Sequence, residues 1–412
     1  MSLKRILAGA AMVIASLVSA GVAQPAFATA TPAAGSLDPA FGAGGKVLTN
    51  LGTGANGQPI QAVTSNAALA PNGDIVVSGN FGVVRYLPNG TLDTSFGAGG
   101  RAMTGFPVNA VAVQPNGEIV AVGTGQGNTV STGTFNVDRF TTSGALDPAF
   151  GTGGTVTTTF PQTALGAGAT RVLVEADGNI LVGGGAGAIG HDNAIINHAE
   201  LALYNPNGAL VQGFGSGGLL KTGFGLPTTV GVDAAGDIFL TDGIELSPTG
   251  QVDASATPAT IVATNVGAGT LTFRSGAKVV EALAVGGRGF TQVEAVGFNA
   301  DGTTDTTFFT PAFSYAQGAG HNLPAAVAVE ANGQIVIAGT SSGSTSVFGV
   351  ARTNATGSLD TAFGTNGVLT TSFQGNDHAV AVLIQPNGDI IVIGKSVNSA
   401  GVSDIALARY LG

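Results

Sequence analysis

Four histidines and two neighbouring aspartates are the residues of this sequence that could perform acid–base or metal chemistry near neutral pH. Imidazole nitrogens and carboxylate oxygens can bind a metal ion or exchange protons with a substrate. The candidates are His191, Asp192, His198, His321, Asp377 and His378. The nearest pair of histidines lacks the spacing of zinc ligands on one regular element, so we expect scattered loop histidines, no bound metal and no cofactor.

A second set of residues pairs an arginine with an aspartate eight positions later. In one segment of the same pattern Leu203 and Val211 replace both partners together. The two residues are present together or lost together, which favours a partly buried ion pair that braces a turn. A catalytic site repeated around a rim is the less favoured interpretation. We therefore predict structural pairs and no catalytic residue among them. The pairs are Arg85 with Asp93, Arg139 with Asp147, Arg352 with Asp360, and Arg409 with Asp38, the last one joining the two ends of the chain.

These residues belong to a repeat that contains two recurring phrases. The first reads V-V-R-Y-L-P-N-G-T-L-D-T-S-F-G at Val83–Gly97, with near-copies at Val137–Gly151 and Val350–Gly364. The second joins two Val- and Ile-rich runs through a tight turn, as in A-V-A-V-Q-P-N-G-E-I-V-A-V-G at Ala110–Gly123. Runs of this length and composition predict strands, and Asn-Gly predicts a hairpin with a type I′ turn. The turn glycines indicate seven hairpins: Gly73, Gly117, Gly178, Gly236, Gly276, Gly333 and Gly388.

One repeat of about 55 residues therefore predicts four antiparallel strands, A to D, which is typical of a β-propeller blade. We expect an all-β fold, a seven-bladed propeller with four-stranded blades. Its innermost strands should be small-residue runs such as Ala110–Val113 and Ala326–Val329. The phenylalanine of each Phe-Gly pair should pack as a wedge between blades; these are Phe41, Phe96, Phe150, Phe214 and Phe363.

The repeat is divided between the two ends of the chain. The last residues, Leu407–Gly412, are the first half of the first phrase, and the missing half lies at Gly35–Gly42. We predict that the last blade takes strands A to C from the C-terminus and strand D from about Gly44–Thr49. Such pairing covers strand edges, whereas an open solenoid would need polar caps at its ends.

A blade places its A–B and C–D turns on one face of the ring and its B–C and D–A connections on the other. We expect His191 and His198 in a long B–C loop, and His321 and His378 in D–A connections. All four would then project from the second face. The third blade lies opposite or nearly opposite the sixth and seventh, which counts against one shared site.

The composition indicates an acidic β protein rich in small residues. The chain has 67 Gly, no Cys, no Trp, 9% charged residues and a formal net charge of −10. The absence of Cys excludes disulfides and thiol catalysis. Lysines and arginines are scattered singly, so we expect no nucleic-acid binding and no anionic membrane partner.

The N-terminus has the pattern of a secretory signal peptide. Lys4 and Arg5 precede an apolar run from Ile6 to Ala23, followed by Ala26-Phe27-Ala28. We predict a signal peptide over residues 1–30, cleaved after Ala28 or Ala30, and a single propeller domain over 31–412; the alternative is an uncleaved anchor helix. After residue 30 no apolar stretch is long enough to span a bilayer.

The ordered phrases G-x-L-D-x-x-F-G-x-G-G, A-V-x-x-Q-P-N-G-x-I-V-V-x-G and V-x-R-Y resemble the delta-60 repeat family from about Gly35 to Gly412, and the A–B strand pairs bear a weaker likeness to NHL-type repeats. The resemblance implies a secreted or cell-surface bacterial β-propeller of unassigned function, with no catalytic residues to transfer. The segment Ser247–Ser255 departs from the family pattern because it has no Phe-Gly pair.

Two functions remain open at this point. We favour an exported, monomeric, non-catalytic propeller that binds a cell-wall polymer or surface protein through the face of the B–C and D–A loops. The alternative is a secreted hydrolase or lyase with a site at the channel mouth. Four tyrosines and no tryptophan offer few stacking platforms for a carbohydrate.

Overall fold

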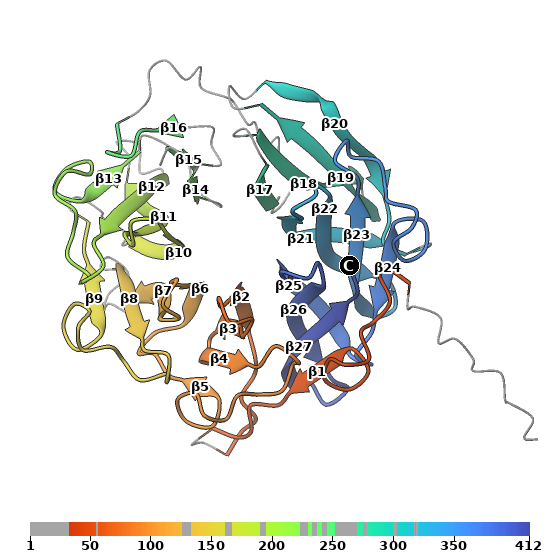
Figure 1. Cartoon of the computed structure of the whole chain (residues 1–412), viewed down its shortest axis with the longest axis horizontal. Helices are drawn as coiled ribbons and strands as arrows, with labels where there is room; N and C mark the ends of the chain where they lie inside the picture. Colours follow the sequence, from red (N-terminus) through yellow and green to blue (C-terminus); the bar gives the residue numbers. More distant parts are fainter. Residues whose placement is uncertain are drawn as a thin grey trace, which may run out of the picture. The chain divides into compact units, whose positions relative to one another are not determined.

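The regular elements of this protein are all β-strands over the residues that its computed structural model describes, namely 33–54, 57–125, 133–160, 167–189, 195–222, 230–232, 237–240, 245–251, 270–274, 278–287, 289–299, 303–316, 318 and 320–412 (Figure 1). No helix in these ranges has the length and hydropathy needed to cross a membrane. The all-β prediction is confirmed for this part of the chain. The predicted signal peptide lies outside it.

Four sheets consist of four antiparallel strands each. Three of them are formed by consecutive strands. The first has β2 (Thr64–Leu69), β3 (Ile75–Gly79), β4 (Gly82–Tyr86) and β5 (Arg101–Ala102); the second has β6 (Val108–Val113), β7 (Ile119–Gly125), β8 (Thr134–Phe140) and β9 (Thr155–Thr158); the third has β10 (Ala167–Val174), β11 (Ile180–Ile189), β12 (Ile195–Tyr204) and β13 (Leu219–Lys221). We name each sheet by its first strand.

The fourth of these sheets joins the two ends of the chain. It combines β25 (Asn376–Ile384), β26 (Ile390–Val397) and β27 (Ser403–Tyr410) with β1 (Lys46–Thr49). β1 pairs with β27 from Lys46 opposite Ala408 to Thr49 opposite Ile405. The Gly35 N–H also donates to the Leu411 carbonyl at 2.8 Å, so both ends build one turn. The predicted strand exchange between the ends is confirmed.

The other described strands form a three-stranded and an eight-stranded sheet. The first has β14 (Val230–Val232), β15 (Ile238–Leu240) and β16 (Glu245–Leu246). The second contains two meanders: β17 (Thr270–Arg274), β18 (Lys278–Gly287), β19 (Phe290–Phe298) and β20 (Thr304–Phe313), then β21 (His321–Val329), β22 (Ile335–Ser342), β23 (Ser346–Thr353) and β24 (Val368–Thr371). A single parallel bridge between Thr291 and His321 links the two meanders.

The first strands of successive sheets lie beside one another. β25 contacts β2, β2 contacts β6, β6 contacts β10, and β10 contacts β14; β21 contacts both β17 and β25. Figure 1 shows these first strands nearest the middle of the unit Ala33–Gly412, with the later strands of each sheet further out. Ala110–Val113 and Ala326–Val329 lie in β6 and β21, so their predicted innermost position is confirmed.

The core lies between adjacent sheets, which explains the long Val and Ile runs. Ile75, Val76 and Val77 are all fully buried, although neighbouring residues of a strand point to opposite faces. Ile75 and Val77 pack with residues of the β25 sheet, whereas Val76 packs with residues of the β6 sheet. Each sheet is therefore covered on both faces, and alternation of polar and apolar residues is not required.

The predicted type I′ turns are wrong in the β2 and β6 hairpins. Gly73 has φ of +88°, but Asn72 and Asn116 are not among the non-glycine residues with positive φ. The Gly73 N–H donates to the Ala70 carbonyl at 2.8 Å, and the Ala70 N–H donates to the Asp74 carbonyl at 2.8 Å. This is a three-residue loop in which only the glycine is left-handed. The Asn72 Oδ1 accepts the Asp74 N–H at 3.1 Å, which stabilises the turn without positive φ at asparagine.

Candidate functional site

The predicted loop histidines lie in strands wherever the structure describes them. His198 is in β12, His321 begins β21, and His378 is in β25. The loop prediction is wrong because the ladders continue past the apolar runs. β11 and β12, for example, pair without interruption from Ile180 opposite Tyr204 to Ile189 opposite Ile195. His191 and Asp192 lie outside the described residues.

Asp377 and His378 do not form an acid–base pair. As neighbours in β25 they face opposite sides of the sheet. Asp377 is fully buried, and its Oδ2 accepts the Phe373 N–H at 2.8 Å. The pKa of His378 lies below its ordinary value, first because of burial and then because of the nearby Lys395, while Asp377 acts in the opposite direction. Within the described ranges no group of three or more His, Cys, Asp or Glu could hold a metal ion.

The Arg–Asp pairs form close ion pairs at the C–D turns. The Arg85 Nη2 lies 2.6 Å from the Asp93 Oδ2, and the Arg139 Nη2 lies 2.5 Å from the Asp147 Oδ2. The corresponding distances are 2.8 Å for Arg352 to Asp360 and 2.5 Å for Arg409 to Asp38. Each guanidinium also stacks over the phenylalanine of the following Phe-Gly pair, at 4.5 to 4.8 Å from the ring centroid (Phe96, Phe150, Phe363 and Phe41).

Three of these arginines also reach the next sheet. The Arg85 Nη1 donates to the Thr142 carbonyl at 2.6 Å and the Arg409 Nη1 donates to the Pro88 carbonyl at 2.7 Å. Arg139 donates in the same way to Pro206. Because their donors are used by partners in the protein, we interpret these arginines as braces between sheets.

A tyrosine–threonine hydrogen bond links adjacent sheets in a way that the sequence analysis missed. The hydroxyl of Tyr86 donates to Thr49 at 2.8 Å, and the hydroxyl of Tyr410 donates to Thr371 at 2.7 Å. Tyr204 and Thr158 lie 2.7 Å apart in the same arrangement. The sequence signals of this contact were the tyrosine that ends the third strand and the threonine four residues after a turn glycine, as in Gly45–Thr49, Gly154–Thr158 and Gly367–Thr371.

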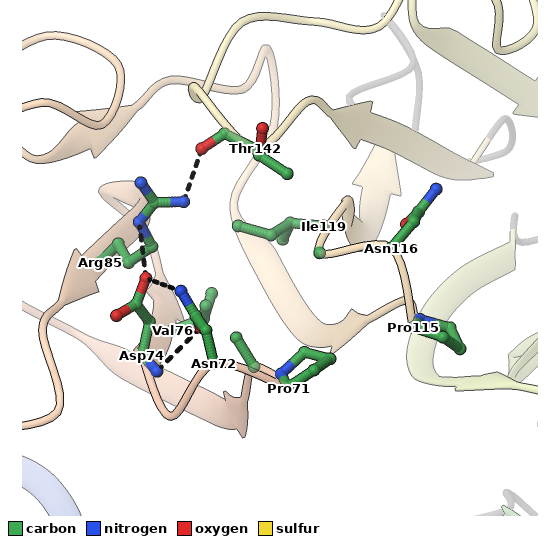
Figure 2. A pocket seen from close by; sticks show the side chains of 11 residues that line it. Pro71, Asn72, Asp74, Val76, Arg85, Pro115, Asn116, Ile119 and Thr142 are labelled. Atoms are coloured by element: carbon green, nitrogen blue, oxygen red, sulfur yellow. Dashed lines mark hydrogen bonds and ion pairs between the residues drawn. The ribbon is translucent and has the colours of Figure 1, made fainter.

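A groove lies on the turn face between the β2 and β6 sheets, and Figure 2 shows its lining. Two Pro-Asn-Gly turns form its walls, and Thr142 closes one side. Arg85 is its cation, and it is engaged by Asp93, by the Thr142 carbonyl and by Asp74, whose Oδ2 lies 3.6 Å from the Arg85 Nε. Its cation is therefore already paired and is not available to a ligand.

A second cavity lies between the first strands of four sheets, and we call it the central cavity. It has a volume of about 320 Å³. Its lining combines small apolar side chains with a hydroxyl, an amide and a guanidinium. Its lining consists of Ser65, Asn66, Ala67, Arg171, Ala325, Ala326, Val327, Val380, Ala381 and Val382. The sequence analysis missed Arg171, because it expected only small residues at the axis.

A one-residue bulge recurs in the first strands of the repeat, including β6, which does not line the cavity. In β2, β10, β21 and β25 the register with the second strand shifts by one residue, leaving Ser65, Thr170, Ala325 and Val380 as the extra residues. Such bulges re-aim the side chains beside them and are frequent next to binding sites. The bulges position residues that the cavity uses, including Asn66 and Arg171.

Three acidic side chains are buried in other parts of the fold. Burial raises the pKa of Asp138 to about 6, and it raises the pKa of Glu200 and of Glu281 to about 7. They lie in β8, β12 and β18, and therefore in three different sheets.

Comparison with known families identifies the repeat. Four segments match the family model described as "Domain of unknown function (DUF5122) beta-propeller": residues 70–96, 114–150, 330–363 and 385–411. Each match begins at an A–B turn, and the first three end at the phenylalanine of a Phe-Gly pair. The resemblance to a propeller-repeat family is thus confirmed. No curated protein sequence matches this chain.

The solved structures that align with this chain have low sequence identity to it. The extracellular domain of a putative one component system from B. thetaiotaomicron is 13% identical at a TM-score of 0.44, over 88% of this chain and 40% of that chain. A protein of unknown function from Dyadobacter fermentans is 11% identical at 0.41, over 89% and 99%. A gluconolactonase from Xanthomonas campestris is 13% identical at 0.39, over 92% and 99%. At these values no activity or ligand is carried over to this chain.

Proposed function

Because the chain carries the repeats of a β-propeller family, we propose that it is an exported, non-catalytic, seven-bladed β-propeller that acts as a binding module. Its ligand would be a cell-wall polymer or a surface protein, bound through the face of the B–C and D–A connections. The described strands fall into seven antiparallel groups, which supports the blade number: β2–β5, β6–β9, β10–β13, β14–β16, β17–β20, β21–β24, and β25–β27 with β1.

The observation that carries this proposal is a set of apolar side chains exposed beside the non-repeating connections; the turn face also exposes Leu87 and Leu146. On the turn face the repeated arginines are engaged by carboxylates and carbonyls. At the other ends of the strands, large apolar side chains are exposed. They are Val63, which precedes β2, Met103, which follows β5, Phe290 at the β18–β19 hairpin, and Leu323 near the start of β21. Exposed apolar groups beside non-repeating connections are typical of a surface that meets a partner.

Phe290 and Leu323 mark one part of this surface. Phe290 is 54% exposed and Leu323 is 48% exposed. Their strands are held together by the Thr291–His321 bridge and by the Asn322 Nδ2, which donates to the Thr291 carbonyl at 2.9 Å. His321, which lies between Phe290 and Leu323 in the sequence, is also exposed. The two apolar side chains therefore project from a fixed framework.

The alternative of a hydrolase or lyase gains no support from the central cavity. Its described lining contains neither a carboxylate nor an imidazole, so it offers no proton donor or acceptor of suitable pKa.

The test is retention of residues 31–412 on peptidoglycan, wall polysaccharide and surface-protein fractions. We expect retention by at least one fraction and a clear loss in the double variant Phe290→Ser with Leu323→Ser. The matched control is Leu87→Ser with Leu146→Ser, which removes two exposed leucines from the turn face. Equal retention of both variants, or release of wall fragments by the wild type, would contradict the proposal.

A further inference from the structure

We propose that the central cavity binds a monocarboxylate with a short apolar chain, and that Arg171 holds its carboxylate. This inference rests on the proposed function, because it names the chemistry of one ligand of the binding module. Arg171 lies in β10, directly after the bulge between Ala169 and Arg171, and it lines the cavity together with residues of β2, β21 and β25.

The guanidinium of Arg171 lacks the partners that the other inter-sheet arginines have. Its Nη1 donates to the Thr170 carbonyl at 2.8 Å. Across the described ranges, no carboxylate forms an ion pair with it, in contrast to Arg85, Arg139, Arg352 and Arg409. A guanidinium has five N–H donors, so Arg171, which lines the cavity, has donors beyond the Thr170 bond that a ligand can use. Burial lowers the pKa of Arg171, which shows that the site disfavours an uncompensated charge.

Packing does not explain an arginine at this position. Arg171 lies seven residues before the turn glycine Gly178, and the equivalent residues before Gly73, Gly117, Gly333 and Gly388 are Asn66, Ala110, Ala326 and Ala381. Alanine occupies three of these four positions and asparagine the fourth, whereas the β10 sheet places a long cation there. An anion bound in the cavity would offset the desolvation of this charge.

The walls indicate which anion fits. A single guanidinium matches the planar, singly charged carboxylate through two parallel hydrogen bonds. Ala325, Ala326 and Val380, which β21 and β25 contribute to the lining, offer an apolar surface to a short hydrocarbon chain. Phosphate would bring a second negative charge into an acidic protein of net charge −10, with no second cation in the described lining. The cavity therefore favours a monocarboxylate over phosphate.

The test uses residues 31–412 and isothermal titration with linear monocarboxylates of increasing length, together with hexanamide and inorganic phosphate. We expect hexanoate to bind and to raise the melting temperature, and hexanamide to bind at least about tenfold more weakly because its headgroup is neutral. Arg171→Met should weaken hexanoate binding by at least about tenfold. The matched control is Arg101→Met, because the Arg101 Nε likewise donates to one backbone carbonyl, that of Phe81, at 2.6 Å.

Three results would overturn the inference: no binding of any carboxylate to the wild type, equal affinity for hexanoate and hexanamide, or unchanged hexanoate binding in Arg171→Met. The melting temperature of Arg171→Met without ligand is a further readout. A ligand-binding arginine predicts an equal or higher value, whereas a large decrease would show a structural role and contradict the assignment. Retention on wall fractions, measured in parallel, separates the two proposals: loss of carboxylate binding with retention intact refutes this inference alone.

Discussion

Glu200 makes the stability of this protein depend on pH in a direction opposite to that of an ordinary salt-bridged acid. Its side chain is fully buried in β12, and neither carboxylate oxygen has a hydrogen-bond partner within the described structure. Burial raises its pKa from 4.5 to about 7, and Lys221, opposite it in β13, opposes this shift. The folded protein therefore retains a proton at Glu200 that the unfolded chain has already released.

The sign and size of the effect follow from this difference. Between the unfolded pKa of 4.5 and the folded pKa of about 7 the folded state binds more protons, so the free energy of unfolding falls as pH rises. Below pH 4.5 both states are protonated and the residue has no effect. A shift of this size corresponds to roughly 3 kcal/mol once the pH exceeds 7. The pKa of about 7 already includes the opposing effect of Lys221.

Glu200→Gln should remove this dependence. We expect the variant to match the wild type at pH 4.5 and to be more stable at pH 8, by up to roughly 3 kcal/mol in urea unfolding. Lys221→Gln provides the opposite perturbation and should steepen the wild-type decline, because it removes the cation that favours the charged carboxylate. If Glu200→Gln declines between pH 4.5 and 8 as steeply as the wild type, the assignment is wrong.

Three further changes test the contacts between sheets. Arg85→Ala should lower the free energy of unfolding by about 2–4 kcal/mol, because it leaves Asp93 and Asp74 partly buried without their cation. The control Arg101→Ala loses one carbonyl contact and should lower it by about 1 kcal/mol. Equal losses in the two variants would count against a brace. Gly90→Ala should lower the melting temperature more than Gly99→Ala. Both glycines have positive φ, but only at Gly90 would a new Cβ lie 2.8 Å from the Phe41 ring. A similar melting temperature for both variants would refute the packing of Phe41 as a wedge between sheets. Removal of residues 405–412 should abolish the cooperative transition seen by circular dichroism, since β27 pairs with both β26 and β1, whereas removal of Gly412 alone should preserve it.

The sequence predicted the elements that the repeat fixes. The Val and Ile runs on either side of Gly73 and Gly117 are strands, and the two ends share one sheet. These predictions succeed because packing on both faces requires the same residue types at the same spacing in every copy. The three-residue loop at Gly73 could not be distinguished from a type I′ turn, because Asn-Gly suits both and the choice depends on the strand register.

The candidate site was less predictable because it depends on which strand lies innermost and on which face a side chain points. His198 could not be placed without knowing how far β11 extends beside it. Arg171 follows a bulge, and a bulge exchanges the two faces of the strand for every residue after it. Glu200 is one charge in an ordinary strand pattern, and only the packed neighbours show that it is buried.

Several departures from the repeat lie together in the β10 sheet. This sheet has Leu203 and Val211 where four other groups of strands have the Arg–Asp pair, and it also contains Arg171 and Glu200. It therefore lacks the brace, and it carries a partly buried arginine and a fully buried glutamate whose charged forms are disfavoured. A sheet of this kind gains most from a ligand that compensates one of these charges, since binding to the folded state alone raises stability by mass action. Anion binding at Arg171 should consequently protect the β10 sheet from hydrogen exchange more than the β2 sheet, where Arg85 is already paired. Equal protection of both sheets by hexanoate would show that the ligand binds elsewhere.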